Sequence, residues 1–400
     1  MEKEFRVYTE SPSSPGLMRL WLGPKPIILV YKPETIKVIL ESPTLITKPM
    51  EYNALRQWVG VGLLTSTGEA WHTRRKMLTP ESAMGINLGA QKGFSQEYCE
   101  AVRRMSEMIF MRIRAPWLWP KSLWYLSGYG SEFDENLKIA QSVTKRVIIE
   151  RKQERERIRN DDSSSESSKE SIKEIWEEEN LGIKAKHKRS AFLDLLLDMQ
   201  EENKLTDTMI LNEVDTFMFE GHDTVSSSMG YTVYMISQKP EIQEKIYEEL
   251  KGIMETSDAE ITHEDVGRMK YLEQCIKETM RMFPTVPLIA RVIEEDTVVG
   301  DFILPKGVTA LVAPFAVHRD RRFFDNPDNF DPEHFSSENY PFNFILGQKF
   351  ATMEQKLILG RFFRRYKVTA ALHELENRGL PELILKPAKG FPVRIERRPE

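Results

Sequence analysis

Polar, chemically active side chains interrupt one long apolar segment of this chain. Between residues 208 and 236, apolar residues recur mostly every three or four positions, which predicts a long helix packed on much of its circumference. Its middle reads Glu220-Gly221-His222-Asp223-Thr224. A glycine disfavours a helix by about 1 kcal/mol relative to alanine, and a threonine hydroxyl can bond back to a carbonyl and bend it. The pattern predicts a groove in which acid and hydroxyl groups face a pocket; the alternative is an exposed face with solvated polar groups.

Two further pairs have spacings that put both members on one helix face. Trp71 and Arg75 lie four residues apart after turn signals at Gly62 and Gly68, and an indole N–H beside a guanidinium can bind an anionic group such as a carboxylate. Ordinary packing is the alternative for this pair.

The second pair is Glu278 and Arg281, in a predicted helix over 269–283 that Pro284 ends. Exposed pairs of this kind stabilise a protein little. The neighbouring positions of this helix are mostly apolar, among them Cys275, so the pattern favours a buried, structural ion pair.

The elements that position these residues are mainly helices. Further helices are predicted over 33–40, 96–113, 136–159, 192–199 and 241–254, and strands over 20–22, 27–31, 287–291, 297–304 and 308–312. Residues 160–190 begin with a polar, low-complexity run and are predicted to form an exposed loop. The fold class is mainly α with a small β region, in a single domain over 1–400.

Composition excludes several classes of protein. The net charge of −5 gives no global basic field, so no nucleic-acid partner is expected. Two cysteines form no disulfide framework, no disulfide partner is expected, and the count fits a reducing compartment. No apolar run reaches the length of a membrane span and the start has no signal-peptide core, so the chain as written is expected to be soluble.

The order of these motifs resembles a cytochrome P-450, and more narrowly the family 4 branch, many of whose members hydroxylate fatty acids and related lipids. The likeness covers most of residues 15–397. The matching stretches are Trp71 with Arg75, residues 220–224, Glu278 with Arg281, Arg291, residues 329–335 and residues 347–351.

The resemblance implies a role for each matching residue near the heme. Asp223 and Thr224 match the acid–alcohol pair that delivers protons to iron-bound dioxygen. Glu220 matches the residue that in this branch can form an ester with a heme methyl. The side chains that bind heme propionates in the family correspond to Trp71, Arg75 and Arg291.

The resemblance also implies a structural pair, a cofactor and partners. Glu278 and Arg281 match the pair that braces the loop beneath the heme, together with an Arg at the position of His334. The implied cofactor is heme b, with electrons from NADPH through a flavoprotein reductase. The implied substrate is a lipid-like or other apolar small molecule, and the implied location is the endoplasmic reticulum membrane, where most members are held by an N-terminal helix.

The chain departs from the family pattern at three places. Family members carry a Cys two residues before the Gly that matches Gly347, and its thiolate binds the iron. Here Ile345 holds that position, and the glycine-rich part of the loop is missing. Pro80 runs directly into Glu81, where the family has several helices, and the N-terminal anchor of the family is expected to be missing. The P-450-like fold is therefore expected to be incomplete, as though segments had been skipped.

No other residue is a persuasive iron ligand. Cys275 is expected to be a small core residue, and Cys99 lies in a region remote from the heme in family members. A histidine ligand would give a different, globin- or peroxidase-like iron, with His222 and His334 the nearest candidates. Two hypotheses remain: a heme-dependent monooxygenase whose printed sequence is defective, or a catalytically dead pseudo-enzyme or apo binder of apolar ligands.

Overall fold

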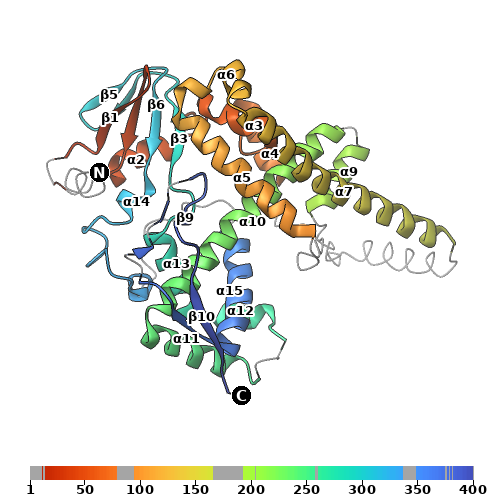
Figure 1. Ribbon diagram of the computed structural model, residues 1–400, viewed down its shortest axis with the longest axis vertical. Coiled ribbons are helices and arrows are strands. Elements are labelled where there is room, and N and C mark those ends of the chain that lie inside the picture. Colours follow the sequence, from red (N-terminus) through yellow and green to blue (C-terminus); the bar gives the residue numbers. More distant parts are fainter. Residues whose placement is uncertain are drawn as a thin grey trace, which may run out of the picture. The chain divides into compact units, whose positions relative to one another are not determined.

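The computed structural model divides the chain into two compact units, each described here by itself. It describes residues 11, 14–78, 94–164, 192–202, 204–256, 260–336, 348–373, 376–377, 379–380 and 382–399. Unit 1 comprises Met1–Asn53, Ile109–Trp119 and Phe219–Glu400, and unit 2 comprises Ala54–Met108 and Pro120–Met218. Helices predominate in both (Figure 1), which confirms the predicted mainly α fold class with a small β region.

The main sheet of unit 1 has four strands in the order β1-β2-β6-β3. These are β1 (Leu17–Leu22), β2 (Lys25–Val30), β6 (Thr309–Val312) and β3 (Ile289–Val292). The β1–β2 hairpin turns tightly at Gly23, whose φ of +59° suits a residue without a Cβ. β2 pairs with β6 in parallel, whereas β3 pairs with β6 antiparallel. The helix α2 (Pro33–Leu40) buries Ile36 and Ile39 in the same apolar cluster as Val30.

Three two-stranded sheets complete the β region of unit 1. β4 (Thr297–Val299) pairs with β5 (Phe302–Leu304), β7 (Tyr366–Ala370) with β10 (Val393–Arg397), and β8 (Gly379–Leu380) with β9 (Lys386–Pro387). The predicted strand segment 297–304 is therefore a hairpin in itself. The turn after it leads into β6 of the main sheet and does not form a hairpin with it.

The helical part of unit 1 surrounds one apolar cluster. Buried residues from α10 (Asp207–Ser237), α11 (Pro240–Ile253), α13 (Lys270–Met282) and α15 (Gln348–Arg365) meet there, among them Met235, Ile246, Leu272 and Phe363. Cys275 belongs to this cluster and is fully buried, as expected of a small core residue. Shorter elements are α12 (His263–Arg268), α14 (Pro314–Val317), η1 (Met50–Tyr52), η2 (Pro116–Leu118) and η3 (Pro332–Phe335).

Unit 2 is built from helices, as far as the structure describes it. They are α3 (Asn53–Val59) from Ala54 onward, α4 (Gly68–Leu78), α5 (Phe94–Arg114) up to Met108, α6 (Lys121–Leu126), α7 (Tyr129–Ser164), α9 (Phe192–Glu201) and α10 up to Met218. Neither unit has a helix among its described residues that is long and apolar enough to cross a bilayer.

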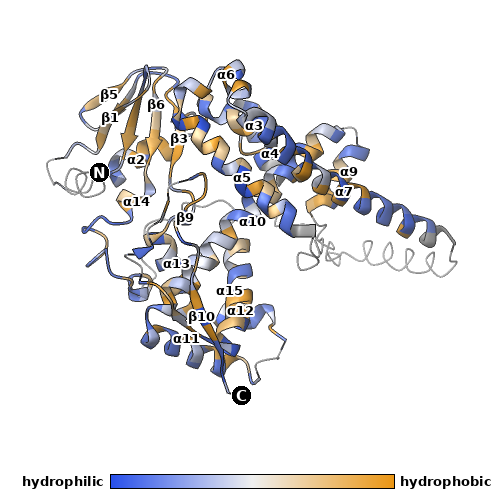
Figure 2. Ribbon diagram, in the orientation of Figure 1, coloured by the Kyte–Doolittle hydropathy of each residue, from blue (hydrophilic) through white to orange (hydrophobic). Residues whose placement is uncertain are grey.

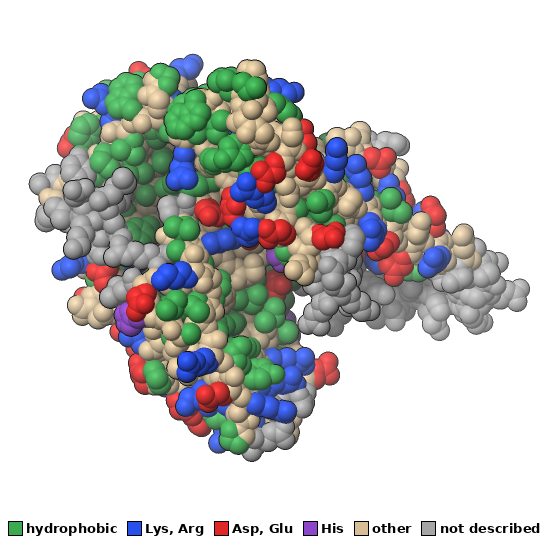
Figure 3. All heavy atoms as spheres, in the orientation of Figure 1, with side chains coloured by type: hydrophobic (Ala, Val, Ile, Leu, Met, Phe, Trp, Pro, Cys, Tyr) green, Lys and Arg blue, Asp and Glu red, His purple; other side chains and the backbone are tan. Residues whose placement is uncertain are grey.

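Helix α7 runs further than its sequence predicts. It continues to Ser164, so residues 160–164 are helical and the predicted loop over 160–190 is wrong at its start; residues 165–190 lie outside the described part. The far end of α7 is hydrophilic (Figure 2), and its surface carries interspersed positive and negative side chains (Figure 3). Arginines on it pair with acids of α9: Arg151 Nε lies 2.8 Å from Asp194 Oδ1, and Arg159 Nη2 lies 2.6 Å from Glu201 Oε2.

One carboxyl group is buried between α7 and α10 in unit 2. Asp215 Oδ1 accepts a hydrogen bond of 2.6 Å from the Thr144 hydroxyl, whereas Oδ2 has no hydrogen-bond partner among the described residues. Burial raises the pKa of Asp215 to about 7, against the opposing effects of the Thr144 hydrogen bond and the Lys145 charge.

We expect Asp215→Asn to stabilise unit 2 at alkaline pH. The folded form binds the Asp215 proton more tightly than the unfolded form, so stability is lost as pH rises from about 4 to about 7. The asparagine does not ionise, so the gain in stability of the variant should be about 3 to 4 kcal/mol larger at pH 8 than at pH 4. Urea unfolding at both pH values measures this, with the exposed Asp207→Asn as control. An equal gain at both pH values would show that ionisation of the buried Asp215 carboxyl does not destabilise the fold.

Candidate functional site

The predicted polar segment lies within a continuous stretch of α10. The Thr224 hydroxyl donates to the carbonyl oxygen of Glu220, and the Ser226 hydroxyl donates to that of Asp223 at 3.2 Å. These back-bonds satisfy the hydroxyls inside the helix. Among the described residues, no heavy atom lies within 4 Å of where a Cβ on Gly221 would stand, and Gly221 is exposed. Asp223 is buried, while Gly221 and His222 are exposed.

Glu220 acts electrostatically on ionisable side chains of unit 1, among them Lys48 and Tyr52. Lys48 and Arg291 repel one another, and desolvation together with this repulsion lowers the pKa of Lys48 to about 7, against the opposing effect of Glu220. Desolvation also lowers the pKa of Arg291, while the nearby Tyr52 acts in the opposite direction. Two cations held close together out of water favour an anionic group beside them. The structure thus brings Glu220 and Arg291 into one electrostatic neighbourhood.

Sequence reasoning missed Lys48 and Tyr52. A single lysine in a loop and a tyrosine in a short 3₁₀ turn carry no periodic or motif signal. Next to Lys48, the carbonyl oxygen of Thr47 accepts a hydrogen bond of 2.9 Å from the Val292 N–H on β3, and such a long-range contact is not visible in local sequence.

Trp71 and Arg75 lie in unit 2, on α4, and interact with each other. The Arg75 guanidinium carbon is 5.2 Å from the centroid of the Trp71 ring, a cation–π distance. The prediction that both share one helix face is confirmed. On the same helix, Arg74 forms an ion pair with the buried Glu213 of α10. Of the three predicted propionate-binding residues, Trp71 and Arg75 belong to unit 2 and Arg291 belongs to unit 1.

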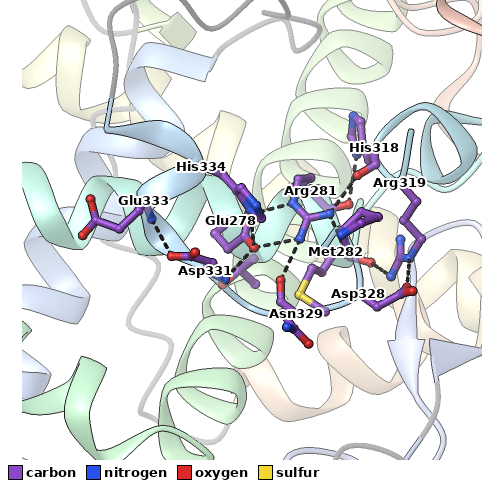
Figure 4. A network of polar contacts seen from close by, with 12 residues as sticks. Glu278, Arg281, Met282, His318, Arg319, Asp328, Asn329, Asp331, Glu333 and His334 are labelled. Atoms are coloured by element: carbon purple, nitrogen blue, oxygen red, sulfur yellow. Dashed lines mark hydrogen bonds and ion pairs between the residues drawn. The ribbon is translucent and has the colours of Figure 1, made fainter. Parts of the chain in front are cut away.

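The pair on α13 is fully buried and bidentate (Figure 4). Arg281 donates from Nε to Glu278 Oε2 and from Nη2 to Oε1, both at 2.7 Å, and neither side chain is exposed. The remaining Arg281 donors bond backbone carbonyls, at 2.7 Å for Pro327, 2.8 Å for His318 and 3.1 Å for Asn329. The interpretation of Glu278 and Arg281 as a buried structural pair agrees with this geometry.

The third member of this network is His334. Its Nδ1 lies 3.2 Å from Glu278 Oε1, and its Nε2 lies 2.7 Å from the carbonyl oxygen of Asp325. The backbone N–H of Asp331 also donates to Glu278 Oε1 at 2.8 Å. Glu278 and Arg281 together therefore hold the chain from residue 318 to residue 334 against α13. Both ring nitrogens of His334 have partners here, which leaves neither for an iron atom.

Glu278 and His334 each favour the charged form of the other. Burial alone would raise the pKa of Glu278, but the hydrogen bonds and charges of Arg281 and His334 outweigh it and the pKa lies below its usual value. The hydrogen bond to Glu278 raises the pKa of His334. Desolvation lowers the pKa of His318 to about 4, so that ring is neutral at physiological pH.

The structure describes no side chain suited to bind iron as a thiolate. Burial raises the pKa of the Cys275 thiol, with neighbouring carboxylates adding to the effect, so Cys275 stays protonated. Cys99 is half-buried on α5 of unit 2. Among the described residues, no three His, Cys, Asp or Glu side chains gather as a metal site. Ile345 lies outside the described residues, and its alkyl side chain has no donor atom.

A mainly helical fold with a small β region, a buried Glu–Arg brace and an acid beside a hydroxyl on α10 agree with the expected class, a heme monooxygenase. The family model described as "Cytochrome P450" matches residues 11–87 and 81–394. The chain therefore belongs to the cytochrome P450 family, whose members are heme-thiolate monooxygenases, and membership implies a heme iron.

Two relatives place the chain in family 4. It is 38% identical to Cytochrome P450 4V2 of Mus musculus over 460 residues, which covers 98% of this chain and 84% of the relative. It is 32% identical to Cytochrome P450 4c3 of Drosophila melanogaster over 445 residues, covering 95% and 82%.

The alignments also locate the departures from the family. The 460 aligned positions exceed the 400 residues of this chain, so at least 60 of them are gaps in it. The two family-model matches meet at residues 81–87, the point where the sequence passes from Pro80 to Glu81. This supports the expectation that an internal segment of the family fold is missing after Pro80. The residues present do not fit a heme-thiolate, because the ligand position holds Ile345.

Proposed function

We propose that this protein is a monooxygenase that inserts one oxygen atom from O2 into a lipid-like or other apolar substrate. Electrons would come from NADPH through a flavoprotein reductase at the endoplasmic reticulum membrane. The observation that carries the proposal is the segment Glu220–Thr224 on α10, with a buried acid directly followed by a hydroxyl, in a chain 38% identical to a family 4 relative over nearly its whole length.

Each residue of the site receives a role in this proposal. Asp223 passes on the protons that the reaction consumes, and Thr224 presents the neighbouring hydroxyl. Glu220 is the candidate for an ester link to the heme b cofactor. Arg291, with Trp71 and Arg75, binds the anionic groups of that cofactor, and the position of Lys48 beside Arg291 supports adding it to this set. Heme b, when bound, supplies the oxygen chemistry.

The present sequence lacks the cysteine-bearing loop that binds iron in the family, and it cannot perform this reaction without that loop. Ile345 offers no electron pair to iron, so a loop with a cysteine at that position must be restored. Ile345 also favours the second candidate function, a catalytically dead pseudo-enzyme or apo binder of apolar ligands, for the chain exactly as printed.

Product formation by a loop-restored chain tests the proposal. In this variant, residues 339–346 are replaced by the corresponding loop of the Mus musculus relative, and the protein is supplied with heme, reductase, NADPH and lauric acid. We expect hydroxylated lauric acid by mass spectrometry, and a rate at least ~100-fold lower for Asp223→Asn in the same background. A restored chain that binds heme but oxidises neither lauric acid nor a terpenoid ester would overturn the lipid substrate class.

A further inference from the structure

The buried carboxylate of α10 has a partner that the motif comparison does not assign. Asp223 is 6% exposed, and its Oδ1 lies 3.0 Å from the ammonium nitrogen of Lys386 on β9. Its other oxygen, Oδ2, has no hydrogen-bond partner among the described residues. The Lys386 side chain is 26% exposed and so reaches from solvent to the buried acid. All these atoms belong to unit 1.

The backbone around Lys386 is fixed against α10. The Ser227 hydroxyl, one helical turn after Asp223, donates to the Leu385 carbonyl oxygen at 2.6 Å. The Leu385 N–H donates to the Thr285 carbonyl oxygen at 2.8 Å. Lys386 itself pairs with Leu380 in the β8–β9 ladder. Three independent contacts therefore hold this lysine beside Asp223, unlike a solvated surface lysine.

An ionised carboxylate in a buried site is unfavourable unless a charge and hydrogen bonds compensate it. Lys386 supplies that charge at one oxygen only. The carboxylate is then anchored through Oδ1 in one orientation, and Oδ2 is left without a hydrogen-bond partner among the described residues.

We propose that Lys386 is the positioning residue of Asp223, fixing its carboxylate through Oδ1 so that proton transfer runs through Oδ2. The inference rests on the proposed function, because it takes Asp223 as the acid that passes on protons. It adds a residue from the C-terminal β8–β9 hairpin to a site otherwise built on α10.

A double-mutant cycle on the printed chain tests whether the pair exists in solution, without heme. Lys386→Met leaves the buried carboxylate unpaired and should lower the Tm by about 5 °C. Asp223→Asn in the same protein should recover most of that loss. Lys277→Met is the matched control, because Lys277 forms a more exposed ion pair with Glu273 on α13. Additive effects of the two substitutions, with no recovery, would overturn the pairing.

Kinetics of the loop-restored chain test the positioning role. Lys386→Met should lower kcat about tenfold or more with KM changed less than twofold, and Lys386→Arg should restore most of the rate. Lys277→Met should change neither constant. An unchanged kcat in Lys386→Met, or a raised KM alone, would overturn the assignment of Lys386.

The same experiment separates the two proposals. If Asp223→Asn keeps its rate, the proposed role of Asp223 fails, and the positioning role of Lys386 fails with it. If Asp223→Asn is slow while Lys386→Met is not, only the assignment of Lys386 fails. A loop-restored chain that binds heme with the red-shifted band of a thiolate complex and still makes no product would overturn the proposed function and this inference together.

Discussion

Glu278→Gln is expected to lower the free energy of unfolding by about 3 to 5 kcal/mol, because it leaves the fully buried Arg281 guanidinium without its carboxylate. The substitution also weakens the acceptor for the Asp331 N–H and removes the charge that faces His334. A loss of this size is a large part of the total stability of a typical domain. Urea unfolding followed by circular dichroism measures it.

Two variants calibrate this result. Glu41→Gln removes an exposed pair with Lys37, whose atoms are 3.9 Å apart, and should cost less than about 0.5 kcal/mol. His334→Gln removes only the third member of the network. Since Glu278 raises the pKa of His334, the charged histidine stabilises the fold fully below its unfolded pKa of about 6.5, and this is lost as pH rises through the folded pKa.

The effect of His334→Gln should therefore be larger at pH 6 than at pH 9. If Glu278→Gln proves too unstable to purify, His334→Gln still tests the network. An effect of Glu278→Gln no larger than that of Glu41→Gln would show that the brace between α13 and residues 318–334 does not stabilise the fold.

The helices that carry the site were predictable because their signals are local. The apolar spacing around residues 208–236 and 269–283 predicted α10 and α13 to within a residue or two at each end. The three-residue separation of Glu278 and Arg281 on an apolar helix was enough to predict a buried pair. Each of these signals lies within a few helical turns, where the sequence determines which side chains share a face.

Contacts between distant segments were not predictable in the same way. Lys386 meets Asp223 across more than 160 residues, and the two are brought together by the docking of the Leu385 backbone on α10. The segment that carries Lys48 is bound to β3 through the hydrogen bond from the Val292 N–H to the Thr47 carbonyl oxygen, more than 240 residues away in the sequence. The extension of α7 over residues 160–164 has no structural explanation in the contacts of the described residues.

The printed chain, reconstituted with heme, reduced and exposed to carbon monoxide, is expected to show no strongly red-shifted Soret band. That band requires a thiolate ligand. Ile345 has no donor atom, and burial keeps the Cys275 thiol protonated. We expect the band to be absent and not merely weakened, because no other interaction can replace a thiolate ligand to the iron.

Two variants make the result interpretable. The loop-restored chain should give the red-shifted band. Ile345→Cys alone should give a weaker one, because the glycine-rich backbone that normally surrounds the thiolate is still missing. A red-shifted band in the printed chain would contradict the prediction, and its loss in Cys99→Ala or Cys275→Ala would identify the unexpected ligand. A loop-restored chain without the band would place the defect elsewhere, and the discontinuity between Pro80 and Glu81, where the family-model matches meet, is then the next segment to restore.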